Sequence, residues 1–185
     1  MADRRRVDLR ATGSERLGPV VGDDIVPDAR LIATRSITIS APPPDVFPWL
    51  RQMGFRRAGW YSWDLIDNLG RRSATEIHPE WQTLQSGDSV PGGPIGFEAT
   101  VVDAPSRLVL RLDGRGRLAR RIRFTLAYEL RADAVGTRLV TRVRSRIDLP
   151  AGRLIERFVL GPGDGFMVRR QLVNVARRAE RTTIS

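Results

Sequence analysis

Between residues 122 and 147 the chain alternates between apolar and other side chains over two successive runs, which Val135-Gly136 separates. Successive side chains of a strand point to opposite faces of a sheet, so this pattern predicts an antiparallel pair with one buried face. The buried set of the first run is Ile122, Phe124, Leu126, Tyr128 and Leu130. In the second run Leu139, Thr141, Val143, Ser145 and Ile147 point inward, while Arg138, Arg142, Arg144 and Arg146 point outward. We expect this arginine stripe to lie on a solvated face.

A long amphipathic helix is predicted after this pair. Its apolar side follows the i, i+4, i+7, i+8, i+11 spacing that is typical of a buried helix face. Gly161-Pro162-Gly163 is expected to separate it from a shorter helix over Leu154 to Leu160. The apolar positions of the long helix are Val168, Leu172, Val175, Ala176 and Ala179.

The first half of the chain predicts a strand, two short helices and a hairpin. Residues 31–39 are rich in β-branched side chains, and the prolines at 42–44 end this strand and suit the start of a helix. A second short helix is predicted over 63–69 and a hairpin over 97–112. Residues 1–30 are polar and rich in glycine and proline, so we expect a flexible or loosely docked arm before one domain over 31–185.

Composition excludes several kinds of chemistry. The chain has no cysteine and one histidine, His78, which argues against thiolate catalysis, a Ser-His-Asp triad and a zinc site. No Gly-rich phosphate loop follows a strand and no acidic spacing resembles a calcium loop, so we expect neither a cofactor nor a metal. Without disulfides, a transmembrane run or a secretory signal, a cytoplasmic location is expected.

The charge is strongly positive and unevenly distributed. All 31 basic residues are arginine, and the net charge is +10. Residues 1–106 hold 12 arginines and 14 acidic residues, whereas residues 107–185 hold 19 arginines and 7 acidic residues. Such asymmetry is compatible with a nucleic-acid or anionic-membrane surface, but a solvated arginine face is the more frequent outcome.

The segment GWYSWDLIDNLG, residues 59–70, concentrates aromatic rings and carboxylates. As a structural element it is a capped helix, with Ser62 as N-cap, Asp64 in the first turn and Asp67 paired with Arg71 at i, i+4. As a functional element it brings carboxylates next to Trp60, Tyr61 and Trp63, where desolvation would raise their pKa. Capping and packing are the more frequent roles of such residues.

Three further polar residues are weighed. His78 would need a neighbouring carboxylate, from Glu76 or Asp67, to move protons, and a structural role is the more frequent one. Glu98 alternates with Phe97, which predicts a solvent-exposed carboxylate unless a bulge reverses the register. Tyr128 lies on the apolar face of its strand, where its hydroxyl needs a partner that a ligand could supply.

Several segments resemble one known superfamily: ATRSITISAPPPDVFPWLRQMG, GWYSWDLIDNLG, IHPEWQTLQSGDSV and the strand pair ending GTRLVTRVRSR. Over roughly residues 24–182 the chain is similar to an uncharacterised bacterial branch of the START-like, polyketide-cyclase/dehydrase and birch-pollen-allergen-related (SRPBCC) superfamily. The resemblance implies an α+β helix-grip fold, in which a curved antiparallel sheet wraps the C-terminal helix and two short helices follow the first strand.

The resemblance also implies a cavity for a hydrophobic or amphipathic small molecule, such as a lipid or polyketide-like compound, between sheet and C-terminal helix. The expected wall and lining residues are Trp60, Tyr61, Trp63, Phe124, Tyr128, Val168 and Leu172, with Asp64 and Asp67 as polar anchors. The alternative is a cyclase, dehydratase or isomerase with a cavity carboxylate as general base, for which Asp64, Asp67 and His78 are the candidates. No catalytic motif of a characterised relative matches this sequence residue by residue.

Overall fold

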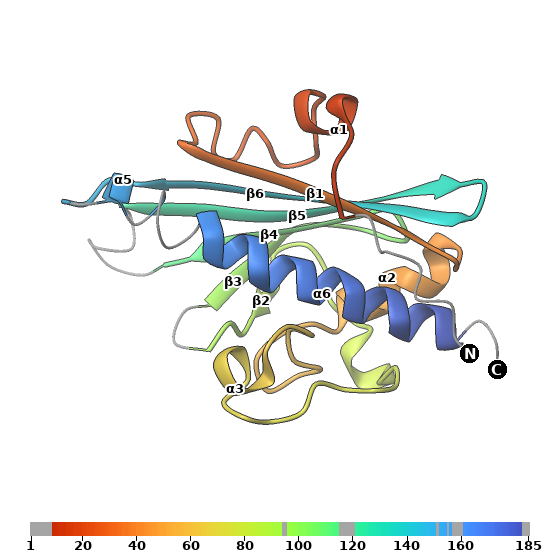
Figure 1. Ribbon diagram of the computed structural model, residues 1–185. Coiled ribbons are helices and arrows are strands. Elements are labelled where there is room, and N and C mark those ends of the chain that lie inside the picture. The colour runs from red at the N-terminus through yellow and green to blue at the C-terminus, as the bar shows by residue number, and fades with distance from the viewer. Residues whose placement is uncertain are drawn as a thin grey trace.

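The computed structural model describes residues 9–93, 96–114, 121–150, 152–154, 156 and 161–182. Six antiparallel strands form one curved sheet in the order β1-β6-β5-β4-β3-β2, and a long helix, α6, lies along one face (Figure 1). The strands are β1 (Leu31–Ile39), β2 (Ser89–Val90), β3 (Gly96–Asp103), β4 (Arg107–Asp113), β5 (Ile122–Asp133) and β6 (Gly136–Ile147). The helices are α1 (Gly13–Leu17), α2 (Pro43–Arg51), α3 (Asp64–Asp67), the 3-10 turn η1 (Pro79–Trp81), α5 (Gly152–Leu154) and α6 (Gly161–Thr182).

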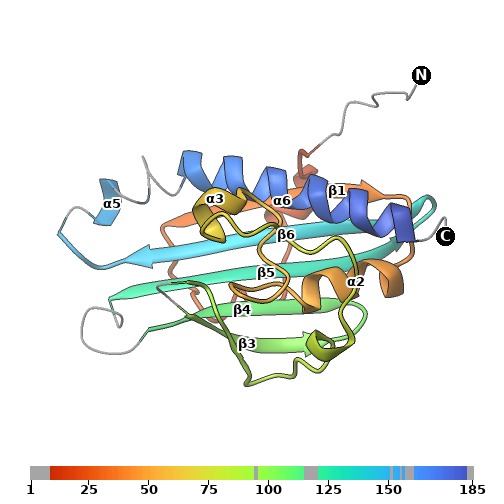
Figure 2. The same cartoon turned by 90° about the horizontal axis from the view of Figure 1, so that it is seen from below.

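The predicted helix-grip arrangement is confirmed: the sheet holds α6, and α2 and α3 follow β1. Seen from below in Figure 2, α6 runs along the sheet with α2 and α3 on the same side. We call this side the helix face and the opposite side, which carries α1, the arm face. The predicted inward set of β5 and β6 lies on the helix face, where Tyr128 pairs with Thr141 and Leu126 with Val143.

The helix face carries the main core. Apolar side chains of all the long strands meet α2 and α6 there, because each strand contributes alternate residues to this face. The fully buried members include Trp49 of α2, Leu108 and Leu110 of β4, and Leu172 of α6. This continuous core fixes α6 on the sheet.

The start of α6 differs from the prediction. Residues 161–163, expected to separate two helices, form the first turn of α6 instead, because a proline is tolerated in a first helical turn, where its missing N–H has no helical partner. The shorter helix predicted over Leu154 to Leu160 lies largely outside the described residues.

Residues 9–30 lie across the arm face. Val20 packs there with Val109, Ala127 and Val140 in a second, smaller apolar cluster. Gly22 allows the close approach, because its φ is +82° and a Cβ at this position would lie 2.8 Å from Val109 Cγ1. The segment that the sequence marks as an arm therefore has a packed contact with the sheet.

Two of the four β6 arginines, Arg142 and Arg144, are buried, and Arg138 and Arg146 are half-buried, which corrects the expectation of a solvated face. Arg142 is buried; its guanidinium forms a 2.6 Å ion pair with Asp23 and donates to the carbonyl oxygens of Glu15, Arg16 and Gly18. Arg144, also buried, donates to the carbonyls of Val26 and Pro27. The arm supplies carbonyl and carboxylate acceptors that a sequence pattern within β6 cannot reveal.

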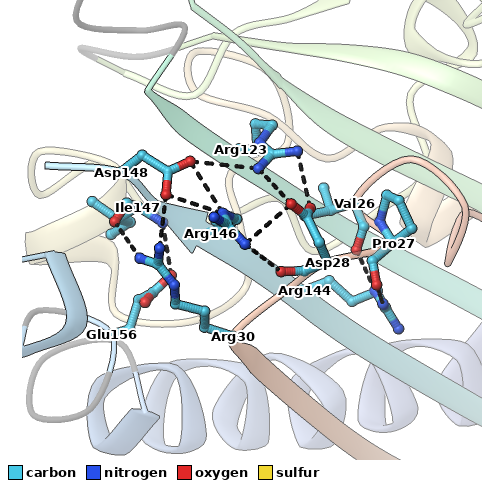
Figure 3. A network of polar contacts seen from close by, with 10 residues as sticks. All are labelled: Val26, Pro27, Asp28, Arg30, Arg123, Arg144, Arg146, Ile147, Asp148 and Glu156. Carbon is cyan, nitrogen blue, oxygen red and sulfur yellow. Dashed lines mark hydrogen bonds and ion pairs between the residues drawn. The ribbon is translucent and has the colours of Figure 1, made fainter.

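A second group of charges closes this contact at the far end of β6 (Figure 3). Asp28 of the arm pairs with Arg123 at 2.9 Å and with Arg146 at 3.1 Å. Asp148 pairs with Arg30 and Arg146, and Arg30 also donates to the Ile147 carbonyl. The hydrogen bond from Arg123 is the main reason why the pKa of Asp28 lies below its ordinary value. These exposed pairs align the arm with β6 but contribute little energy individually.

Glu15 is the buried acid of the arm. Its carboxylate pairs with Arg138 at 2.8 Å and accepts hydrogen bonds from the Ser36 hydroxyl and the Thr12 backbone N–H. The bond from Arg138 is the largest cause that lowers the pKa of Glu15 from 4.5 to about 2, although burial alone would raise it. Glu15 is therefore a charged group that the arm must keep ionised in order to stay docked.

Candidate functional site

The segment 59–73 is an irregular loop that crosses α6, and it differs in detail from the predicted capped helix. Its helical part is only Asp64–Asp67, and its N-cap is Trp63 without a side-chain hydrogen bond. Ser62, the predicted cap, has a buried hydroxyl that finds no hydrogen-bond partner in the described part of the chain. The predicted Asp67–Arg71 pair is wrong, because the helix ends at Asp67 and both carboxylate oxygens of this residue are buried.

Polar side chains of α6 hold this segment through its backbone. Gln171 donates to the Trp60 carbonyl at 2.9 Å, Asn174 to Tyr61 at 2.8 Å and Arg170 to Ser62 at 2.9 Å. Arg178 adds a 2.8 Å bond to the Ala74 carbonyl. Because the acceptors are backbone carbonyls, these four hydrogen bonds do not depend on which side chains the segment carries. We call residues 59–74 together with these four donors the clasp.

Tyr61 is the best-anchored side chain of the clasp. Its hydroxyl accepts a 2.7 Å hydrogen bond from Gln52, and burial raises the pKa of this phenol, so that it stays neutral. The Arg178 guanidinium lies 4.7 Å from the ring centroid. The backbone φ of Tyr61 is +56°, a left-handed conformation that costs free energy for a bulky residue and persists only when surrounding contacts enforce it.

The two carboxylates of α3 have different environments. Asp64 accepts a 2.5 Å hydrogen bond from the Ser73 hydroxyl. Neither carboxylate oxygen of Asp67 has a hydrogen-bond partner among the described residues. Burial is the main cause that raises the pKa of Asp67, and the charge of Asp64 adds to this rise, while the nearby backbone N–H groups of Trp63 and Asp67 and the Ser62 hydroxyl offset part of it. Asp67 is the group that most resembles an acid/base or polar anchor.

Trp63 connects the clasp with the start of α6. Phe166 stacks on the indole with ring centroids 4.9 Å apart and planes 13° apart. The Arg170 guanidinium lies 3.8 Å from the centroid of the same indole, a cation–π contact. The buried indole N–H has no hydrogen-bond partner among the described residues. Trp63 is therefore half-buried between α3 and α6 rather than part of the main core.

A row of aromatic rings follows the helix face toward the start of β5. Trp60 contacts Phe97 edge-to-face at 5.4 Å, and Phe97 lies 6.2 Å from Phe124. Along β5 the side chains on this face pass from fully buried at Tyr128 to half-buried at Phe124 and Ile122. On this face, β5 is thus more deeply buried at Tyr128 than at Phe124 and Ile122.

Tyr128 differs from the expectation that a ligand would supply its partner. Its hydroxyl donates a 2.7 Å hydrogen bond to Gln171, and the amide of Gln171 bonds the Trp60 carbonyl. Gln171 was not among the predicted site residues. Gln171 lies three residues after Val168, on the apolar stripe of α6. A glutamine on an otherwise apolar helix face was the sequence signal that could have identified it as a buried polar site residue. Val168 and Leu172 are core residues on this stripe.

The remaining candidates lie outside the clasp. His78 contacts Glu80 at 3.4 Å and the ring of Trp81 at 4.4 Å, so its neighbouring carboxylate is neither Glu76 nor Asp67. Glu98 pairs with Arg111 at 2.6 Å on the arm face, as the alternation predicted. Within the described ranges no group of three or more His, Cys, Asp or Glu residues could hold a metal ion.

A cavity lies where β4 and β5 separate. Their pairing ends at Arg111 and Thr125, although both strands continue beyond this pair. The space of about 250 Å³ is closed from the arm side by Ile25 and Val26. Its other lining residues are Arg111, Leu112, Asp113, Gly114, Ile122, Arg123 and Phe124. The cavity therefore reaches the last ring of the aromatic row at Phe124.

Comparison with known proteins supports the fold. No protein-family model and no curated protein sequence matches the chain. The structure is similar to StfQ, a di-domain ARO/CYC protein of the steffimycin biosynthetic pathway, with a TM-score of 0.57 at 10% identity over 86% of this chain and 53% of StfQ. BexL, a di-domain ARO/CYC of the BE-7585A biosynthetic pathway, gives 0.50 at 16% identity over 85% and 53%. A Mesorhizobium loti protein gives 0.51 at 15% identity over 82% and 98%.

These matches show the fold alone. The chain has the helix-grip fold that the sequence resemblance implied, and it shares this fold with the two ARO/CYC proteins. It spans about half the length of the two di-domain proteins and nearly all of the M. loti protein. Across the described residues, no helix combines the length and the apolar character that crossing a bilayer would require.

Proposed function

We propose that the protein binds a hydrophobic or amphipathic small molecule between the helix face of the sheet and α6. The observation that carries this proposal is the half-buried end of the aromatic row at Phe97 and Phe124. Phe124 also lines the cavity, and half-buried apolar rings of this kind offer contact area to a ligand, because binding sites are lined mainly by such groups. The similarity in fold to ARO/CYC proteins supports the same reading.

In this proposal Trp60 and Phe124 form the wall, with Tyr61, Trp63, Tyr128, Val168 and Leu172 behind or beside it. The Tyr128 hydroxyl is already bonded to Gln171, so its role is to shape the wall. Asp67 is the polar anchor, because its buried oxygens lack a hydrogen-bond donor that an amphipathic ligand could supply.

Native mass spectrometry of the purified protein is the first test. A co-purifying lipid or polyketide-like compound, identified after denaturation, supports the proposal. Saturable binding of the fluorescent fatty acid cis-parinaric acid then tests the site. Phe124→Ala should weaken binding about tenfold, because a phenyl ring contributes roughly 1.5–3 kcal/mol when buried. Phe55→Ala is the matched control, since Phe55 is half-buried outside the aromatic row. Equal affinity in both variants, or no saturable binding, would contradict the proposal.

The raised pKa of Asp67 favours one alternative, an enzyme of the cyclase, dehydratase or isomerase type with this carboxylate as general base. The two functions separate on Asp67→Asn, tested with the compound that mass spectrometry identifies. With a carrier, Asp67→Asn changes the affinity for an uncharged ligand little, because the asparagine keeps one acceptor oxygen for the anchoring hydrogen bond, and neither the variant nor the unchanged protein forms a product. An enzyme keeps binding but loses turnover by roughly 10²–10⁴-fold.

A further inference from the structure

Four large apolar side chains lie exposed at the outer edge of the clasp. Leu65 is 80% exposed, Ile66 65% and Leu69 75%, and Phe166 at the start of α6 is 58% exposed. Trp63 lies between the two groups, since it precedes α3 and stacks on Phe166. We call these four residues the outer apolar cluster. Single exposed apolar residues are ordinary, whereas a contiguous group marks a surface that contacts something else.

The cluster is held in place. α6 binds the carbonyls of the clasp through Arg170, Gln171, Asn174 and Arg178, so α3 is presented on a fixed support. Figures 1 and 2 show α3 beside α6, on the side of the sheet opposite to α1. Leu65, Ile66 and Leu69 are therefore exposed on a segment that α6 holds in place.

Near the cluster, the described arginines are exposed, whereas the carboxylates of α3 point inward. Arg71 and Arg72 follow α3 and are exposed, and Arg169 and Arg170 beside Phe166 are also exposed. The carboxylates of α3 turn inward: Asp64 bonds Ser73, and both oxygens of Asp67 are buried. The cluster is therefore an apolar centre with a positive rim.

We propose that this surface docks onto an anionic lipid bilayer. The apolar side chains enter the region between headgroups and acyl chains, and Arg71, Arg72 and Arg169 contact anionic headgroups, while Arg170 stays bonded to the Ser62 carbonyl. The inference does not depend on the ligand proposed above, because none of the four cluster residues belongs to the aromatic row. It would place the clasp at the membrane surface.

Charge complementarity favours a bilayer over a second copy of the chain. A symmetric dimer through this cluster would bring Arg71 and Arg72 of one copy close to the same basic rim of the other. Like charges opposed across an interface are unfavourable. An anionic bilayer satisfies both the apolar centre and the rim.

Co-sedimentation with large unilamellar vesicles tests the inference. The full chain should bind vesicles of phosphatidylcholine mixed with phosphatidylglycerol and bind pure phosphatidylcholine much more weakly. Leu65→Ser combined with Ile66→Ser should lower the partition coefficient of the protein into vesicles about tenfold or more. The reason is that these two aliphatic side chains become buried when the protein docks into the bilayer. Arg71→Gln combined with Arg72→Gln should lower it about fivefold per arginine, and this loss should shrink as salt rises.

The matched control is Leu17→Ser combined with Val135→Ser. These residues are 90% and 62% exposed but lie in α1 and in the β5–β6 turn, away from the cluster. The control should bind vesicles like the unchanged protein, and circular dichroism should show that all variants fold. The inference is overturned if the unchanged protein does not bind anionic vesicles, or if the cluster variant binds as well as the control. Light scattering could instead show that the unchanged protein and the control are dimers and that the cluster variant is a monomer. Together with an absence of vesicle binding, this result would assign the surface to self-association.

Discussion

On the helix face of the sheet α6 is held by apolar side chains, whereas on the arm face residues 9–30 are held mainly by arginines of β6. The helix face is an apolar core, in which each side chain contributes to the free energy of unfolding in proportion to the area that it buries. The arm face contains a small apolar cluster and a row of charges whose partners lie more than 100 residues away in sequence. The arm should therefore separate from the sheet under conditions that leave the helix face intact.

The largest effect is expected for Arg142→Met. This change removes a buried cation from Asp23 and three carbonyls, and breaking a buried ion pair costs about 3–5 kcal/mol. Urea unfolding and limited proteolysis should show a less stable protein whose arm is cleaved first. Arg131→Met, which removes an exposed pair with Glu129, is the control and should cost less than about 1 kcal/mol. Equal costs would mean that the arm face is an ordinary solvated surface.

Leu172→Ala should cost about 3 kcal/mol, because Leu172 is fully buried on α6 and its truncation leaves a cavity. The loss should raise hydrogen exchange across the whole sheet rather than in the arm. Phe166→Ala, at an exposed position of the same helix, should change the free energy of unfolding by about 0.5 kcal/mol or less. A loss confined to the arm would contradict the division between the two faces.

Acid should release the arm through Glu15. The pKa of this group is lowered from 4.5 to about 2 in the folded protein, so its contribution is complete above pH 4.5 and disappears as the pH falls toward 2. The contribution is about 3 kcal/mol, and Glu15→Gln should remove most of it at neutral pH. Proteolysis of the arm as a function of pH checks this. A Glu15→Gln variant with an unchanged pH profile would show that another acid controls docking.

Tyr128→Phe should cost about 1 kcal/mol. The variant keeps the ring but removes the hydrogen bond to Gln171, which stays buried. Thermal unfolding measures this loss, and proteolysis of the arm should not change. A shift in arm cleavage would show that the two faces are coupled through β5.

The smallest effect has the opposite sign. The pKa of Asp67 is raised by burial, so ionisation at neutral pH costs stability, and the protein gains stability as the pH falls through the folded pKa. Asp67→Asn should therefore raise the free energy of unfolding at neutral pH, by on the order of 0.5 kcal/mol. Asp64→Asn is the control and should be neutral or destabilising, since Asp64 already has a partner in Ser73. A loss of stability in Asp67→Asn would mean that its charge is compensated.

The helix face was predictable because alternation and helical spacing are local patterns. Leu139 and Val143 on β6 and Val168 and Leu172 on α6 all lie in the main core, as their spacing indicated. The arm face was not predictable in the same way. The pattern within β6 predicts a solvent-exposed Arg142, because its partner Asp23 is 119 residues away in the sequence.

The clasp was predictable in composition but not in geometry. Its aromatic and acidic residues marked a special segment, yet Ser62 does not cap α3 and Asp67 does not reach Arg71. Both depended on a regular helix over 63–69. Leu69 has a left-handed backbone, with a φ of +49°, so a regular helix does not extend through it. Tyr61, which precedes the segment, is also left-handed, and contacts from α6, Gln52 and Ser73 hold it there.

The position of β1 has a consequence for how the chain is made. β6 is the only neighbouring strand of β1 in the described sheet, with Leu31 opposite Ser145 and Ile39 opposite Thr137. Roughly 100 further residues must therefore be synthesised before this partner strand exists. At translation rates of about 5–20 residues per second, this delay is on the order of 5–20 s. During that time β1 is an unpaired apolar strand near the ribosome, open to chaperones and to aggregation. Completion of β6 gives β1 its partner and provides the arginines that receive the arm.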